Sequence, residues 1–161
     1  KPMAQLCRSY GFATATRSED HSAAVDTQCF VIDTLGELVA YLACADLAFV
    51  AGSLDPIGGH NVLEPAALGV PVLVGPNTFN FTEVTDLLLE RGAARRIENA
   101  EALAAVLQQL LDDPACRQRM GDAARRTVEE ERGAVTRTLA IVERVVAGER
   151  VVSADWGGAG A

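Results

Sequence analysis

One stretch of the chain contains a complete strand–loop–helix–strand unit, and it limits the fold more than any other feature. The apolar run Leu47 to Ala51 is typical of a buried strand, and Val70 to Val74 is a second such run. Between them lie a loop containing Gly58 and Gly59 and a short helix expected from near Asn61 to Gly69. Strands joined in this way are parallel, so a ligand site is expected at their carboxyl ends.

The polar residues of this unit gather in the loop and in the first helical turn. They are Ser53, His60, Asn61 and Glu64. Gly58 and Gly59 allow backbone N–H groups to approach a ligand closely, and the helix start favours a phosphate. The two carboxylate oxygens of Glu64 suit two neighbouring sugar hydroxyls. The structural alternative is that Asn61 caps the helix and Glu64 completes a capping box.

A second strand-to-helix junction follows a strand expected at residues 28–32. The sequence Asp33-Thr-Leu-Gly-Glu-Leu leads into a helix bearing Leu38, Leu42 and Ala45. Thr34 is placed to cap this helix, with Glu37 in the capping-box position. The functional alternative is that the N–H groups of Gly36 and Glu37 hold a phosphate. Since both junctions lie at carboxyl ends of strands, we expect them to face one cleft.

Strands and helices alternate along the rest of the chain, which predicts an α/β, Rossmann-like doubly wound parallel sheet. Helices are expected at 2–10, from Thr82 as cap to Gly92, after the cap Asn99, and from Pro114 onward. Strands are expected near 13–17, 28–32, 46–51, 70–74 and 94–97. Residues 1–147 form one predicted domain, and residues 148–161 a flexible C-terminal tail.

The composition of the chain argues against nucleic-acid binding and against a metal site. A formal charge of -8 makes nucleic acid an unsuitable partner, so local N–H groups must hold any phosphate. The four cysteines form no C-x-x-C pair and only two histidines occur, so no metal site is expected. Free thiols favour a cytoplasmic setting, and the sequence contains no signal peptide and no apolar stretch of 18 residues. The chain itself is therefore expected to be soluble.

Four motifs together resemble the 3-deoxy-D-manno-octulosonic acid (Kdo) transferases of lipopolysaccharide biosynthesis. The motifs are Asp33-Thr-Leu-Gly-Glu-Leu, Ala45-Asp-Leu-Ala-Phe-Val-Ala-Gly-Ser-Leu, Gly58-Gly-His-Asn-Val-Leu-Glu-Pro-Ala and Gly75-Pro-Asn-Thr-Phe-Asn-Phe. The resemblance covers about residues 10 to 147 and matches the C-terminal, donor-binding half of a glycosyltransferase B fold.

The resemblance implies transfer of Kdo from CMP-Kdo to a lipid A precursor, with inversion of the anomeric centre and without a metal or another cofactor. In this family the N-terminal half carries the membrane anchor, the acceptor surface and the general base. No catalytic residue is therefore expected in this chain, which would be inactive alone. The complete enzyme would lie at the cytoplasmic face of the bacterial inner membrane.

Carried over by position, the resemblance assigns a role to each candidate residue. Gly36, with its neighbours Thr34 and Glu37, would bind the CMP phosphate, with Ser53 close by. His60 and Asn61 would border the phosphate and ribose, and Glu64 would hold the ribose hydroxyls, beside Gly58 and Gly59. The chain departs from the usual family residues at Leu35, Ala51, Val62 and Asn77. The role of Asn77, where the family usually has His, stays open.

The family also has a strand ending in Pro-Arg-His just before the helix expected at residues 2–10, and this chain starts after it. The fold is therefore expected to lack its first strand, which is central in such sheets. Two flanking strands would then expose backbone groups. We expect those strands to pair directly, or the chain to pair or exchange strands with another copy.

Two other functions remain open from the sequence. One is half of a related nucleotide-sugar enzyme, such as a UDP-sugar transferase or epimerase of the same architecture. The chain is also compatible with a non-catalytic interaction module that uses its charged 117–132 helix. The sequence leaves open the number of Kdo units transferred, the acceptor, the oligomeric state and whether residue 1 is a natural start.

Overall fold

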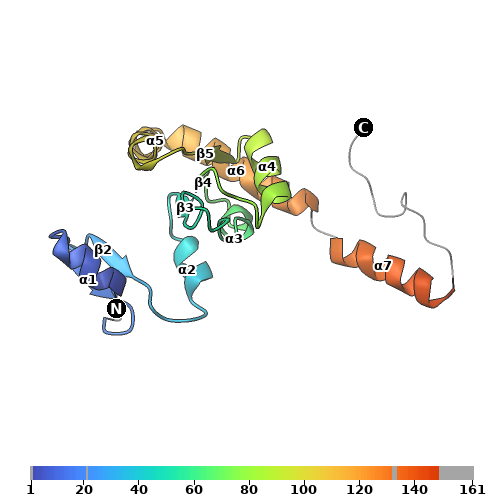
Figure 1. The fold of residues 1–161 in the computed structure, drawn as a ribbon, viewed down its shortest axis with the longest axis horizontal. Helices are drawn as coiled ribbons and strands as arrows, with labels where there is room; N and C mark the ends of the chain where they lie inside the picture. The colour runs from blue at the N-terminus through green and yellow to red at the C-terminus, as the bar shows by residue number, and fades with distance from the viewer. Residues whose placement is uncertain (1, 21, 132–133, 149–161) are drawn as a thin grey trace.

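Helices and parallel strands alternate along the chain (Figure 1), in a computed structural model that describes residues 2–20, 22–131 and 134–148. The strands are β1 Thr14–Thr16, β2 Cys29–Val31, β3 Ala48–Val50, β4 Val72–Val74 and β5 Ala94–Arg96. The helices are α1 Pro2–Ser9, α2 Leu38–Leu42, α3 Leu63–Ala67, α4 Thr82–Glu90, α5 Ala100–Asp112, α6 Pro114–Glu131 and α7 Ala134–Val146. All five expected strands are present, each shorter than expected, and the α/β class is confirmed.

The strands form two parallel sheets rather than one. Strand β1 pairs with β2, and the second sheet has the order β3-β4-β5. In the register of the second sheet, Val72 of β4 lies opposite Ala48 on one side and Ala94 on the other. Each connection within this sheet contains a helix, as parallel pairing requires.

The expectation that strands flanking the absent first strand pair directly is wrong. No ladder joins β1 or β2 to β3 in the described part of the chain. Figure 1 shows α1 and β2 apart from the larger sheet, joined to it through α2. The connection from β2 to β3 contains α2, which packs on α3. Pairing with another copy stays a prediction.

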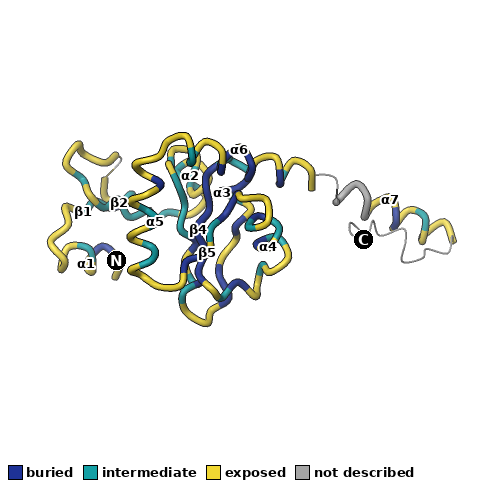
Figure 2. The backbone as a smooth tube through the Cα atoms, turned by 90° about the horizontal axis from the view of Figure 1, so that it is seen from above, coloured by how far each residue is buried: buried dark blue, intermediate teal, exposed yellow. Residues whose placement is uncertain are grey.

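The core is built on β4, whose three residues are all fully buried. Side chains alternate between the two faces of a strand. Val72 and Val74 accordingly belong to one apolar cluster, together with Ala66 of α3 and Leu88 of α4. Leu73 belongs to a second cluster with Leu110 of α5. Figure 2 shows this buried centre between exposed helices. Helices thus cover both faces of the β3-β4-β5 sheet, as a doubly wound fold requires.

The predicted ends of the helices are mostly confirmed. Asn99 caps α5 by accepting a hydrogen bond from the Ala102 N–H at 2.8 Å, and Pro114 is the first residue of α6. The predicted cap Thr82 is wrong by one position, because Phe81 is the N-cap of α4. The predicted tail, apart from Gly148, lies outside the described residues.

Helix α7 is separate from the core in Figures 1 and 2. Three apolar residues of α7, Leu139, Val142 and Val145, are exposed. Within the described residues, none of the helices combines the length and apolar character needed to cross a membrane.

Gly121, in the middle of α6, packs directly against the backbone that follows α3. Replacing a helical glycine with alanine normally stabilises a helix by about 1 kcal/mol. A Cβ on Gly121 would instead overlap the backbone carbonyl oxygen of Gly69. We therefore expect Gly121→Ala to lower the free energy of unfolding by about 1–3 kcal/mol in urea denaturation. Gln118→Ala, at an exposed position of the same helix, is the control and should change it by less than about 0.5 kcal/mol.

Candidate functional site

Ser53 fixes the loop that follows β3. Its hydroxyl donates to the carbonyl oxygen of Val50 at 2.5 Å and accepts from the Gly75 N–H at 2.7 Å. The side chain is 0% exposed. Ser53 therefore joins the carboxyl ends of β3 and β4 through its hydroxyl. Its predicted place close to the phosphate stays a prediction.

The two glycines of the loop are required by a close approach to residues 77–81. Gly58 and Gly59 have φ angles of +99° and +74°, which favour glycine. A Cβ on Gly58 would lie 2.6 Å from Asn80 Nδ2 and would also overlap Phe79. The Asn80 amide donates to the carbonyl oxygens of Ile57 and Gly59 at 3.1 and 3.3 Å. The glycines thus hold one loop against another, and both are buried.

Asn77, whose role the sequence left open, is part of the same connection. Its side-chain amide donates to the carbonyl oxygen of Leu54 at 3.1 Å, and its backbone N–H donates to that of Ser53 at 2.9 Å. Arg96, which sequence reasoning missed, donates to the carbonyl oxygen of Gly75 and forms an ion pair with Asp86 at 3.1 Å. Both residues position loops at the carboxyl edge of the sheet.

The start of α3 presents three polar side chains. Asn61 Oδ1 accepts from the Leu63 N–H at 2.9 Å, and Asn61 Nδ2 donates to Glu64 Oε1 at 3.0 Å. The predicted N-cap Asn61 is wrong by one position, because Val62 is the N-cap of α3, but the Asn61 side chain still accepts from the first N–H of the helix. Glu64 bonds the Asn61 side chain instead of a backbone N–H, so the capping box is wrong. His60 and Asn61 are exposed, and Glu64 is half-buried.

Glu64 keeps one carboxylate oxygen for a ligand. Within the described part of the chain, Oε2 accepts no hydrogen bond, while Oε1 is held by Asn61. The backbone N–H groups of His60 and Asn61 also bond to no described residue. This edge therefore offers acceptors and donors that a bound nucleotide could use.

The second junction is organised by Glu37. Helix α2 begins at Leu38, and Glu37 is its N-cap without a side-chain cap bond. Thr34 Oγ1 donates to Glu37 Oε2, so the predicted cap from Thr34 is wrong. Arg17 Nη2 forms an ion pair with Glu37 Oε1 at 2.9 Å. The hydrogen bonds from Thr34 and then Arg17 lower the pKa of Glu37.

Arg17 is a candidate site residue that the sequence analysis did not single out. It directly follows β1, and its neighbour Ser18 donates to both carboxylate oxygens of Asp33, at 2.9 and 2.6 Å. These bonds lower the pKa of Asp33. They also fix the end of β1 against the junction after β2. The usable signal was an arginine at the carboxyl end of a predicted strand.

Gly36 is exposed in this junction with a φ angle of +82°, and a Cβ built on it would meet no atom within 4 Å. The N–H groups of Gly36 and Glu37 bond to no described residue. They are therefore available to an anion, and Arg17 adds a positive charge beside them. The geometry suits a phosphate.

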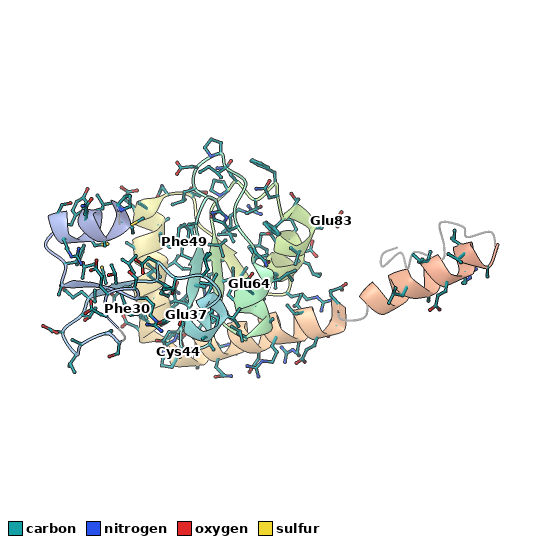
Figure 3. The ribbon with its side chains drawn as sticks, turned by 90° about the horizontal axis from the view of Figure 1, so that it is seen from below. Phe30, Glu37, Cys44, Phe49, Glu64 and Glu83 are labelled. Carbon is teal, nitrogen blue, oxygen red and sulfur yellow. The ribbon has the colours of Figure 1, made fainter. Side chains whose placement is uncertain are left out.

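The two junctions lie side by side. Helix α2 packs on α3, and Figure 3 shows Glu37 and Glu64 on these neighbouring helices. That Thr34, Gly36 and Glu37 share one cleft with His60, Asn61 and Glu64 stays a prediction, which the packing of α2 on α3 supports. In the described ranges, no group of three or more His, Cys, Asp or Glu side chains could hold a metal ion.

Comparison with known proteins identifies relatives of this fold. Residues 15–127 match the family model described as glycosyl transferases group 1. The chain is 37% identical over 142 residues to the 3-deoxy-D-manno-octulosonic acid transferase of Haemophilus influenzae, covering 88% of this chain and 33% of that protein. It is 45% identical over 111 residues to the corresponding Bordetella pertussis transferase, covering 69% of this chain and 26% of that protein.

A solved structure supports the same relationship. The crystal structure of the C-terminal CMP-Kdo binding domain of WaaA from Acinetobacter baumannii superposes with a TM-score of 0.73 at 32% identity. The match covers 77% of this chain and 65% of that chain.

The chain thus spans about a third or less of the curated relatives named above, and the solved domain that it matches is C-terminal. The family-model match covers most of the chain, including both junctions. This chain belongs to the group 1 glycosyl transferases, and its sequence and fold match the C-terminal domain of the Kdo transferases.

Proposed function

We propose that this chain is the donor-binding domain of a glycosyltransferase that transfers Kdo from CMP-Kdo to a lipid A precursor. The observation that carries the proposal is the packing of α2 on α3, the helices that follow the two strand-to-helix junctions at Gly36 and at Glu64. The relatives named above are Kdo transferases, which favours this donor over a UDP-sugar and over a non-catalytic module.

The phosphate of CMP would bind at the junction after β2. The N–H groups of Gly36 and Glu37 are unengaged among the described residues, and Arg17 lies beside them. Glu37 holds the Arg17 guanidinium in one orientation, which lowers the entropy lost when it meets a phosphate. Thr34 in turn orients Glu37. Thr34 and Glu37 therefore position the phosphate site more than they contact the ligand.

The ribose would bind at the start of α3. Asn61 fixes Glu64 through Oε1, and Oε2 then accepts from the ribose hydroxyls. His60 is exposed directly before Asn61 and would border the phosphate. The loop before α3 is held in place by the hydrogen bonds of Ser53, Gly58 and Gly59 described above.

The complete enzyme would contain parts beyond this chain. We propose that the general base, the acceptor surface and the membrane attachment belong to an N-terminal domain, at the cytoplasmic face of the inner membrane. The reaction would invert the anomeric centre and need no metal or further cofactor, with Kdo activated by its CMP leaving group.

The ribose assignment predicts a selective loss of nucleotide binding. Glu64→Ala should weaken CMP binding by about 1–3 kcal/mol in a calorimetric titration, because the ribose hydroxyls lose a charged acceptor. Glu83→Ala is the matched control, since Glu83 is also the second residue of a helix but lies in α4. Equal CMP affinity for parent and Glu64→Ala would exclude the ribose role.

The donor assignment predicts a base preference and a missing activity. Thermal unfolding of the chain should shift upward with CMP and less with UMP or UDP, because ligand binding stabilises the folded state. The chain alone should transfer no Kdo to a lipid A precursor, since the general base lies elsewhere. A larger shift with UDP would support a UDP-sugar enzyme instead, and measurable transfer would show that the general base lies in this chain.

The Glu37 cluster predicts a pH dependence of stability. The pKa of Glu37 is lower in the folded state, so its ionised form stabilises the fold above the unfolded pKa of about 4.3. This contribution is lost as the pH falls through the folded pKa. The difference in melting temperature between parent and Glu37→Gln should therefore shrink from about pH 6 to about pH 3. Glu90→Gln serves as the charge-matched control, and a constant difference for Glu37→Gln would contradict the ion-pair role.

A further inference from the structure

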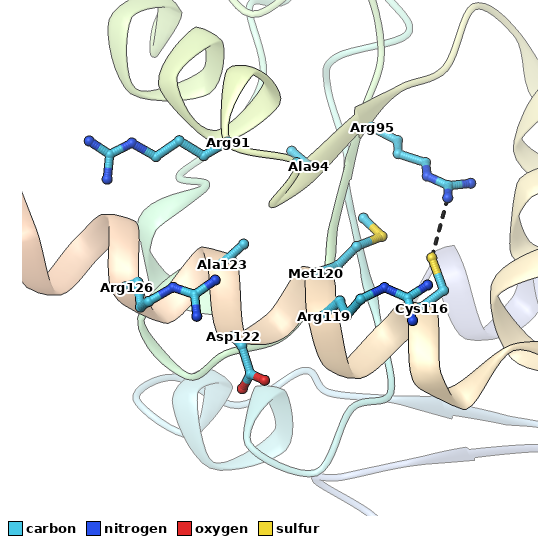
Figure 4. Close-up of a pocket in the computed structure, with 10 residues that line it drawn as sticks. Arg91, Ala94, Arg95, Cys116, Arg119, Met120, Asp122, Ala123 and Arg126 are labelled. Atoms are coloured by element: carbon cyan, nitrogen blue, oxygen red, sulfur yellow. Dashed lines mark hydrogen bonds between the residues drawn. The ribbon is translucent and has the colours of Figure 1, made fainter.

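A second concave surface lies away from the proposed donor edge. Its volume is about 480 Å³, and Figure 4 shows it between β5 and α6. Ala94, the first residue of β5, lines it, so it lies toward the amino end of that strand. The donor edge lies at the carboxyl ends of β2 and β3. We call this surface the arginine pocket; it is lined by Arg91, Gly92, Ala94, Arg95, Cys116, Arg119, Met120, Asp122, Ala123 and Arg126.

The charge of the arginine pocket is opposite to that of the chain. Four arginines face one aspartate in its lining, a local balance of +3 from these residues. The whole chain has a formal charge of -8. The positive charge is therefore local to this pocket. An anion would be attracted to the pocket and repelled by the rest of the acidic chain.

Two of these arginines have partners inside the protein. Arg91 forms an ion pair with Glu130. Arg95 donates to Gln109 Oε1 at 3.0 Å and to Cys116 Sγ at 3.4 Å, the bond drawn in Figure 4. These contacts hold two guanidinium groups at the rim of the pocket. Arg95 still has donors left, because a guanidinium carries five N–H groups.

Arg119 and Arg126 differ from these two. Among the described residues, neither forms a hydrogen bond or ion pair. They are seven residues apart on α6, which places them on the same face, two turns from each other. Both are exposed. Their charges are therefore available to a ligand.

The other two described arginines of α6 have structural roles, because they donate to backbone carbonyl oxygens of neighbouring helices. Arg117 donates to the carbonyl oxygens of Leu110 and Leu111, both at 2.7 Å, at the end of α5. Arg125 donates to the carbonyl oxygen of Leu68 at 3.1 Å, just after α3. Arg119 and Arg126 stabilise no such helix end, so packing does not account for them.

The aspartate of the pocket does not neutralise these arginines. Asp122 Oδ1 accepts from Gln118 Nε2 at 3.0 Å. Figure 4 shows its carboxylate pointing away from Arg95. The base of the pocket is apolar, with Met120, Ala123 and Ala94 all buried. A low-dielectric base strengthens the field of the arginines above it.

We propose that the arginine pocket binds a phosphate-bearing anion at a site separate from the donor edge. Arginine is the side chain best suited to phosphate, because its planar fork donates two parallel hydrogen bonds. The phosphate could belong to a soluble compound or to a phospholipid headgroup. The chemistry of recognition is the same in both, and the experiment below distinguishes them.

The first measurement uses pyrophosphate and the intact chain. Pyrophosphate should slow alkylation of Cys116, which lines the pocket, without slowing that of the exposed Cys44. Mass spectrometry of the alkylated peptides separates the two thiols. Calorimetric titration of pyrophosphate should give saturable binding, and the double variant Arg119→Gln/Arg126→Gln should weaken it about tenfold, as expected when charged hydrogen bonds are lost.

Weaker binding by the double variant could also result from misfolding, so a variant that should bind pyrophosphate more tightly is needed. Asp122→Asn removes the negative charge of the lining and should tighten pyrophosphate binding about threefold. Arg8→Gln, on α1, removes one positive charge outside the pocket and should leave binding unchanged.

The second arm uses vesicles of phosphatidylglycerol, with phosphatidylcholine vesicles as the uncharged control. Cosedimentation that requires Arg119 and Arg126 but occurs without pyrophosphate binding assigns the site to a lipid headgroup. Pyrophosphate binding without cosedimentation assigns it to a soluble phosphate. Binding to neither, or binding that the double variant and Asp122→Asn leave unchanged, would overturn the proposal.

Discussion

The hydroxyl of Ser53 connects the two strands on which the proposed donor site depends. It joins the Val50 carbonyl oxygen to the Gly75 N–H in a position that is 0% exposed. This pair of bonds sets where the loops after β3 and β4 leave the sheet. Gly58 can then approach residues 79–80, and α3 can begin with Asn61 and Glu64 at an exposed edge. A buried hydroxyl thus positions the exposed polar groups of the proposed site.

The acidic chain concentrates its anion-binding groups in two places. At the donor edge, unpaired N–H groups near Gly36 act beside Arg17, whose orientation Glu37 fixes. Such an ion pair keeps net charge low, so backbone dipoles must supply much of the attraction. In the arginine pocket, Arg119 and Arg126 carry charges that no described residue neutralises. The first arrangement favours specificity for one nucleotide, and the second favours a more general anion.

Several features could be predicted because they depend on short segments. The strands around 46–51 and 70–74, the cap Asn99 and the start of α6 at Pro114 follow from local pattern. The predicted helix cap at Thr34 failed because two groups compete for the hydrogen bond of its hydroxyl. Thr34 was placed to bond a backbone N–H, but its hydroxyl bonds the Glu37 carboxylate, which Arg17 also holds. A charged acceptor forms a stronger hydrogen bond, and Arg17 reaches it only through tertiary structure.

The sequence by itself determined the α/β class, the order of its elements and the polar groups at two strand ends, because these depend on periodicity and on glycine, asparagine and proline at particular positions. The tertiary structure alone decided that β1 and β2 remain a separate sheet, that Ser53 faces inward, and that Arg119 and Arg126 share a pocket with Arg91 and Arg95. Those outcomes depend on contacts between residues far apart in the chain, which local pattern does not contain.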